Sequence, residues 1–265
     1  MWKQACLLIG LGMSGPALAD DEPRFCPSRP SLGSSACTTE PGQVHLEVSA
    51  VDWQSDHTLS KRDTSVLVGD FQTRIGVGPT TEAQIGWTPY GHDRSSDELS
   101  GSINGQAGVG DLTLGVRQNL RNPGGQGLSF GIEGSVTLPT GRRPIGGGDW
   151  GASLDVPVSY RVSDLLSVSV TAEADAAVDE DRSGRHFAGD VIATAGIHPA
   201  KNLTFYTEAE GLRDDDPTGH TTQFYAAEGA ALKTSAKLSL WTEAVAGLNS
   251  DSTDIRIFSG FTILF

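Results

Sequence analysis

Long apolar segments are missing from most of this 265-residue chain. Beyond residue 19, no stretch approaches the ~18 to 20 consecutive apolar residues that a membrane-spanning helix needs. Aromatic residues make up only 7% of the sequence, whereas glycine occurs 33 times and proline 13 times. A composition rich in turn formers and poor in bulky side chains favours many short strands over packed helices, and no second domain is required.

The apolar residues at the amino terminus are an exception to this pattern. Lys3 precedes an apolar run from Ala5 to Leu11, which is followed by the helix breaker Pro16 and the small-x-small triplet 17–19. This order predicts a secretory signal peptide, residues 1–19. A buried first helix would instead need a longer amphipathic stretch with a start cap. An exported chain of this kind is either soluble or a membrane barrel.

Cysteine is scarce, with three in the chain. Cys6 would leave with the signal peptide, and its place within the apolar run argues against a lipid anchor. Cys26 and Cys37 would remain and close a short loop in an oxidising compartment, so we expect a disulfide between them. Residues 20–42 are predicted to form a short periplasmic segment that contains this bridge.

Positive charge is also in short supply. The chain has 19 Lys and Arg residues against 33 Asp and Glu residues, a formal net charge of −14. Removal of residues 1–19 takes away Lys3 and no acid, so the charge changes from −14 to −15. An excess of this size repels anionic polymers, and no nucleic-acid partner is expected.

Apolar and polar residues alternate in twelve segments between residue 43 and the end of the chain. Each segment is long enough for a tilted strand that crosses a bilayer, which needs ~9 to 11 residues. The predicted strands are 43–53, 64–77, 82–90, 109–121, 127–138, 150–162, 165–178, 186–198, 202–212, 220–233, 237–249 and 254–265.

The connections between these segments alternate in length. The short ones are 78–81, 122–126, 163–164, 199–201 and 234–236, whereas the intervening ones, including 91–107, 139–149 and 179–185, are longer and more polar. Short turns on one rim and long loops on the other are typical of an up-and-down membrane barrel. We therefore predict an all-β fold, a transmembrane antiparallel barrel of about 12 strands over 43–265. Both termini are expected on the periplasmic side of a bacterial outer membrane.

The two faces of each strand differ in polarity. In segment 109–121, Leu112, Leu114 and Val116 would face lipid while Arg117 and Asn119 face inward. A soluble barrel would show the reverse arrangement, and periodicity alone does not separate the two. The number of charged residues on one face decides, because so many ionised groups could not fill a dry core.

The final strand is strictly alternating. Ile255, Ile257, Phe261, Ile263 and Phe265 share one face, and an aromatic residue ends the chain. This pattern resembles the assembly signal of outer-membrane barrels. It implies that the barrel-assembly machinery binds this strand, and lipid is the other expected partner.

A family resemblance rests on three glycine-rich stretches. They are 37–42 (CTTEPG), 108–117 (GVGDLTLGVR) and 136–141 (VTLPTG). The chain resembles the outer-membrane proteins grouped as the meta-pathway of phenol degradation family, which are often labelled transporters. The resemblance implies a barrel of about this size and passage of small compounds, aromatic ones among them. It supplies no catalytic residues.

The predicted inner wall carries thirteen acids and four arginines, which cannot all pair. The candidates for setting selectivity are Glu47, Asp70, Arg74, Asp111, Arg117, Glu133, Asp155, Arg161, Glu173, Asp175, Asp190, Glu208, Glu210, Glu243 and Arg256. Glu82 and Glu228 complete the set of acids. Water, cations, protonation or the loop arginines Arg142 and Arg143 folded inward would have to compensate the excess. An open bore would favour cations or neutral polar solutes over anions.

A plugged interior is the alternative to an open bore, because ~8 strands leave room only for side chains and 16 or more leave a channel. Segment 220–233 fits least well: with Tyr225 facing lipid, Phe224 and Leu232 join Glu228 inside. Either a bulge or an apolar patch along the bore would explain this. Aromatic residues near the strand ends either form girdles at the two membrane interfaces or lie at unrelated depths in the membrane. They are Trp87, Tyr160, Phe187, Phe205 and Phe265.

Catalytic and metal-binding patterns are weak. His57, His92, His186 and His220 lie in or beside predicted outer loops without tight ligand spacing, so solvated histidines are favoured over a metal site. Barrel lipid hydrolases place a serine two residues after a histidine, and none of the six histidines is followed in this way. We expect no enzyme activity, cofactor or metal. The favoured function is a passive conduit for a small-molecule solute, with an outer-membrane enzyme or a structural or adhesive barrel as alternatives.

Overall fold

The computed structural model describes residues 23–265, so the predicted signal peptide lies outside the described residues. This part of the chain folds into fourteen strands joined by turns and loops. No helix within residues 23–265 is long and apolar enough to cross a membrane. The strands are β1 (Val44–His57), β2 (Lys61–Gly78), β3 (Thr81–Trp87), β4 (Tyr90–Asp97), β5 (Ile103–Gly108), β6 (Leu112–Arg121), β7 (Leu128–Leu138), β8 (Gly151–Arg161), β9 (Leu166–Val178), β10 (Arg185–Ala200), β11 (Leu203–Asp214), β12 (Thr221–Ser235), β13 (Leu238–Gly247) and β14 (Ile255–Leu264).

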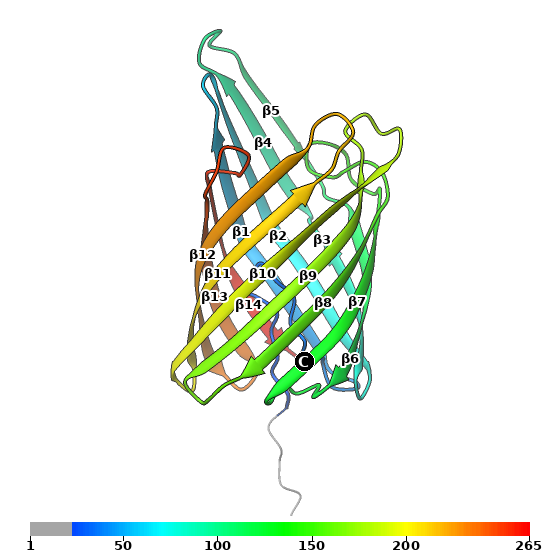
Figure 1. Cartoon of the computed structure of the whole chain (residues 1–265), viewed down its shortest axis with the longest axis vertical. Helices are drawn as coiled ribbons and strands as arrows, with labels where there is room; N and C mark the ends of the chain where they lie inside the picture. The colour runs from blue at the N-terminus through cyan, green and yellow to red at the C-terminus, as the bar shows by residue number, and fades with distance from the viewer. Residues whose placement is uncertain (1–22) are drawn as a thin grey trace, which may run out of the picture.

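The strands form a closed antiparallel barrel (Figure 1). Strand β1 pairs with both β2 and β14, which closes the sheet. Strands β3 and β4 both pair along β2 and act as one wall strand, while β5 and β6 form the next. Fourteen segments therefore make a barrel of twelve strands, and the predicted fold class is confirmed.

The two rims of the barrel differ as expected. In Figure 1 the short connections gather at the lower rim, which we call the turn rim, and the longer loops gather at the upper rim, the loop rim. The β4–β5 hairpin rises beyond the loop rim. Segment 91–107 was expected to be a loop, but it forms most of this hairpin. The hairpin carries no continuous apolar face, so the pattern that marks the other strands is missing.

The outer surface of the barrel is apolar and the inner surface is polar. In β6, Val116 is 54% exposed on the outside, whereas Arg117 is 1% exposed and points inward. The same alternation holds in β7 and β9. Apolar side chains that turn outward all round a closed sheet require lipid rather than water around them. The predicted faces of these strands and the outer-membrane location are confirmed.

The predicted orientation of β12 is wrong. Phe224 and Leu232 point outward, with exposed fractions of 48% and 41%, while Ala227 and Ala231 are buried inside. Glu228 points outward as well and accepts a hydrogen bond from Thr207 Oγ1 at 3.0 Å. Alanines occupy both faces of this strand, so the alternation of apolar and polar residues did not show which face is inside. The prediction then relied on the charge of Glu228, which placed that face inward by mistake.

Strand β14 ends the chain against the start of β1. The Phe265 amide donates to the Val44 carbonyl at 2.9 Å, and the Val44 amide donates back at 3.3 Å. Ile255, Ile257 and Phe265 are exposed on the outer face, as predicted. Recognition of this strand by the assembly machinery stays a prediction. Tyr160 and Phe205 are also outward at the turn rim, where β8 ends and β11 begins.

Candidate functional site

Residues 23–43, which we call the inner segment, run inside the barrel near the turn rim (Figure 1). They contact inward side chains of β1, β2, β3, β6, β8, β9 and β11, which together surround the bore. We expected segment 20–42 to remain periplasmic, but its described part occupies the lumen instead. The physical reason is that its unpaired backbone and hydroxyl groups find carboxylate partners on the wall.

A disulfide closes the tip of the inner segment. Cys26 and Cys37 are bonded, as predicted, and the intervening residues form a loop directed into the bore. The carbonyl oxygens of both cysteines accept hydrogen bonds from Arg74, at 2.7 Å for Cys26 and 2.9 Å for Cys37. The bridge therefore lies directly against one buried wall arginine.

That arginine belongs to a buried ionic network. Arg74 is fully buried and pairs with Glu47 at 2.9 Å and Glu82 at 2.8 Å. Arg117 contacts Glu82 at 3.1 Å and donates through Nε to Glu133 at 2.6 Å. These five residues, which we call the ionic seat, alternate in charge across β1, β2, β3, β6 and β7. Charge-assisted hydrogen bonds of this kind are stronger than neutral ones, so the seat is a firm support.

The glutamates of the seat also bind the backbone of the inner segment. Glu47 accepts the Ser28 amide at 3.0 Å, and Glu82 accepts the Thr39 amide at 2.7 Å. His45 Nε2 accepts the Cys26 amide at 3.2 Å. Each of these donors would otherwise be buried without a partner, which is costly. The wall and the inner segment thus satisfy each other's polar groups.

The far side of the inner segment contacts the rest of the bore. Glu208 accepts hydrogen bonds from Ser31 Oγ and the Leu32 amide, both at 2.7 Å. Asp155 accepts Ser34 Oγ at 3.3 Å. On the seat side of the loop, Arg29 pairs with Asp70 at 2.7 Å. The inner segment therefore bridges the bore from one wall to the other.

Among the inward acids of β8 to β13, seven form no salt bridge within residues 23–265. We call them the acidic wall: Asp155, Glu173, Asp175, Asp190, Glu208, Glu210 and Glu243. Glu173 lies directly across from Asp155 on one side and from Asp190 on the other. Like charges in direct cross-strand positions destabilise a sheet unless water or cations separate them. This row is consistent with a hydrated path along the acidic wall.

The other predicted lumen residues have more local contacts. Asp111 accepts the backbone amides of Gly141 and Gly147 at 2.7 Å and thereby holds the loop between β7 and β8. Arg256 pairs with Asp52 at 2.6 Å. Arg161 lies near the turn rim, 3.5 Å from His198 Nε2. None of these three acts on the acidic wall through a salt bridge.

Of the compensations considered for the inward acids, the inward fold of the loop arginines is not observed. Arg142 and Arg143 are exposed, and Arg143 donates to the Glu180 carbonyl outside the bore. Arg29 of the inner segment enters the lumen instead, where it pairs with Asp70 and lies 5.9 Å from the Trp241 ring centroid. The sequence carried one usable signal for this arrangement, a surplus of inward acids opposite a disulfide-closed stretch rich in serine and arginine.

Cavities remain on both sides of the inner segment. Towards the loop rim, one of about 320 Å³ is lined by Asp111, Glu133 and Asp155, and another of about 370 Å³ by Glu173 and Asp175. Towards the turn rim, a cavity of about 710 Å³ is lined by residues that include Phe25, Arg161, His198 and Tyr206. The inner segment separates these two sets of cavities.

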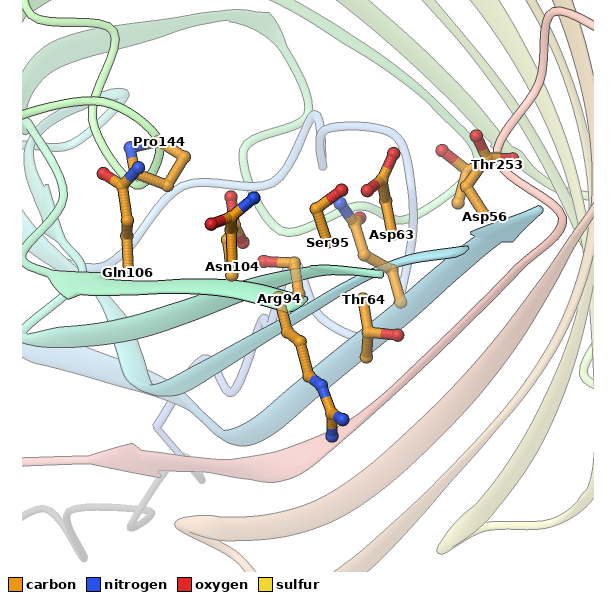
Figure 2. A pocket seen from close by; sticks show the side chains of 12 residues that line it. Asp56, Asp63, Thr64, Arg94, Ser95, Asn104, Gln106, Pro144 and Thr253 are labelled. Carbon is orange, nitrogen blue, oxygen red and sulfur yellow. The ribbon is translucent and has the colours of Figure 1, made fainter. Parts of the chain in front are cut away.

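The β4–β5 hairpin adds a polar mouth above the bore. A pocket of about 250 Å³ lies between its inner face and the loop that carries Pro144. Figure 2 shows Asp63, Ser95 and Gln106 directed to the pocket side, whereas Arg94 points the opposite way. The mouth therefore presents carboxylate, hydroxyl and amide groups rather than the arginine.

The four outer histidines have different environments. His57 and His220 are exposed and lie beside Asp254 and Asp215. His92 is half-buried in the hairpin. His186 has a buried side chain among aspartates, so the expectation of a solvated loop histidine is wrong for this residue. Both of its ring nitrogens lie close to aspartate oxygens, an arrangement that the sequence spacing did not reveal.

Solved structures of similar shape are bacterial outer-membrane barrels. The KdgM porin in complex with disordered oligogalacturonate has a TM-score of 0.51 at 9% identity, over 83% of this chain and 99% of that one. The transport unit of the autotransporter AIDA-I from Escherichia coli has a TM-score of 0.52 at 9% identity, over 84% and 89%. The CymD monoaromatic hydrocarbon channel has a TM-score of 0.48 at 9% identity, over 85% and 88%.

Sequence comparison identifies the family. Among curated proteins, none matches the chain. The family described as "Putative MetA-pathway of phenol degradation" matches residues 28–265, which include most of the inner segment and the whole barrel. The match covers the ionic seat and the acidic wall together. The chain therefore belongs to this family, and the resemblance expected from its glycine-rich stretches is confirmed.

Proposed function

We propose that the protein is a passive outer-membrane channel for small molecules, with the inner segment as its plug. The observation that carries this proposal is the acidic wall, whose seven carboxylates lack salt bridges within residues 23–265. A dry, fully paired interior would not leave Glu173 directly opposite both Asp155 and Asp190. The row favours a bore that water and solutes enter.

The charge of the bore sets the preferred solutes. In the ionic seat, Arg74 and Arg117 offset most of the charge of three glutamates, whereas the acidic wall has no such compensation. A negative field in a narrow bore raises the local concentration of cations and excludes anions. Cationic and neutral solutes should therefore pass in preference to anionic ones.

Family membership suggests aromatic compounds as the solutes to test first. Phe25 of the inner segment and Tyr206 of β11 line the cavity near the turn rim, which suits a small ring. Benzylammonium and benzoate form a matched pair for such a test, because they are similar in size and opposite in charge. We propose that benzylammonium permeates and that benzoate is excluded.

Reversal potentials of the refolded protein in planar bilayers test this function. Under a salt gradient we expect cation-selective currents, and benzylammonium should carry more current than benzoate. The triple variant Asp155→Asn, Glu173→Gln and Asp190→Asn should lose most of this selectivity. Glu228→Gln is the matched control, because it removes a carboxylate from the outer face and should leave selectivity unchanged. An anion preference in the unaltered protein would overturn the proposal.

A second candidate is a closed barrel with a structural or adhesive role. The hydrogen bonds that the inner segment makes around the bore favour it, since they block part of the lumen. Absence of current both from the unaltered protein and from a folded variant with a weakened ionic seat would support this candidate. Lipid hydrolysis in the same silent preparations would support the enzyme alternative instead.

A further inference from the structure

A histidine and three aspartates converge at the loop rim, outside both the ionic seat and the acidic wall. Asp179 follows the last residue of β9, and His186 is the second residue of β10. Asp214 ends β11, and Asp216 lies in the loop that leads to β12. The antiparallel pairing of β9, β10 and β11 brings these four residues together at one end of the sheet.

The distances within this group suit a metal ion. His186 Nδ1 lies 2.9 Å from Asp179 Oδ1 and 3.5 Å from Asp216 Oδ2. One ligand atom from each of the three residues lies within 4.8 Å of the others. Zinc bonds to histidine nitrogen and carboxylate oxygen of ~2.0 to 2.2 Å place neighbouring ligand atoms of a tetrahedral site roughly 3.3 to 3.6 Å apart. Little movement is needed to admit an ion.

His186 supplies an independent sign of a ligand site. Its side chain is only 6% exposed, and Nε2 is buried without a well-aligned hydrogen bond, although Asp214 Oδ1 lies 3.0 Å away. Histidines that bind metals commonly donate the opposite ring N–H to a carboxylate, which fixes the ring. With an ion on Nδ1, the proton would lie on Nε2 and face Asp214.

The second aspartate is held in position by its own loop. Asp216 Oδ2 accepts the Glu180 amide at 2.7 Å, and Oδ1 accepts Thr218 Oγ1 at 2.6 Å. These hydrogen bonds orient the carboxylate before any ion arrives.

We propose that Asp179, His186 and Asp216 bind one divalent transition-metal ion, with Zn²⁺ the best match to this donor set. An imidazole with carboxylates suits Zn²⁺, whereas Ca²⁺ and Mg²⁺ take oxygen ligands. Asp214 positions the imidazole, and water completes the coordination. The ion would join the β9–β10 loop to the β11–β12 loop. An imidazolium paired with the same aspartates is the competing description of the group.

Calorimetric titration of the refolded full-length protein in detergent with ZnCl₂ distinguishes the two descriptions. We expect one Zn²⁺ per chain. His186→Ala should weaken binding by at least about 100-fold, and Asp214→Asn by roughly 10- to 100-fold. His220→Ala is the matched control, because His220 lies on the same rim beside Asp215 and outside the ligand set. It should leave binding unchanged.

Three outcomes would overturn the proposal. They are no Zn²⁺ binding by the unaltered protein, equal binding by folded His186→Ala, and equal loss in His220→Ala. Heat-modified migration in gels reports folding, and Asp216→Asn replaces His186→Ala if that variant does not fold. X-ray absorption of the unaltered protein with Zn²⁺ requires no variant and should detect one imidazole among oxygen ligands. A shell without imidazole would reject the assignment.

Discussion

Replacement of Arg74 by methionine should release the inner segment. Arg74 is fully buried and donates to Glu47, Glu82 and the carbonyls of Cys26 and Cys37. Methionine has an unbranched, flexible side chain that replaces the aliphatic part of arginine, but it is shorter and offers no donor. The variant therefore keeps much of the packing while it removes every polar contact of the residue.

The free energy lost in Arg74→Met has two parts, one in the barrel wall and one in the binding of the inner segment to it. Breaking a buried ion pair costs ~3 to 5 kcal/mol, although here Arg117 still compensates Glu82. That part weakens the barrel wall. The two cysteine carbonyls lose hydrogen bonds to a charged group, each worth about 1.5 to 3 kcal/mol, and this part acts on the seating of the inner segment. The lower sum, about 3 kcal/mol, shifts the ratio of seated to released segments roughly 100-fold.

Single-channel recordings measure this shift directly. We expect Arg74→Met to raise the open fraction of the channel by about two orders of magnitude from a small starting value, and to make the inner segment accessible to added protease. Arg256→Met is the control, since Arg256 pairs with Asp52 and forms no hydrogen bond to the inner segment. Unchanged recordings from folded Arg74→Met, or an equal rise in Arg256→Met, would refute the reasoning.

Three further perturbations follow from the contacts above. The double variant Cys26→Ser/Cys37→Ser opens a short loop whose closure contributes about 3 kcal/mol, so the inner segment should be released more often. Currents that are the same in this variant, and the same with and without added reductant, would contradict the expectation. Gly76→Ala places a methyl group against the Glu40 carbonyl and should displace the inner segment where it joins β1; unchanged protease resistance would argue against that contact. Glu228→Leu removes an outward carboxylate near the middle of β12 and should raise the free energy of unfolding in vesicles by about 1 to 2 kcal/mol; a clear loss of stability would mean that the residue faces the bore.

Much of the barrel can be predicted from the sequence, because contact with lipid requires each strand by itself to alternate apolar and polar residues. A residue such as Val116 must be apolar and its neighbour Arg117 must turn inward, whatever the remaining strands do. Strand positions, loop alternation and the inward acids therefore follow from local sequence. Where that local constraint weakens, prediction fails. The β4–β5 hairpin rises beyond the loop rim and has no continuous apolar face, and β12 carries alanine on both faces.

The plug, the acidic wall and the loop-rim cluster depend instead on contacts between distant positions. Ser31 meets Glu208 across 177 residues, and His186 meets Asp214 and Asp216 only because neighbouring strands end together. No periodicity encodes which inward acids will find partners. The sequence by itself determined a lipid-facing barrel with polar inner faces and a disulfide. Only the tertiary structure decided that the disulfide-closed segment fills part of the bore, because its seat is assembled from five separate strands.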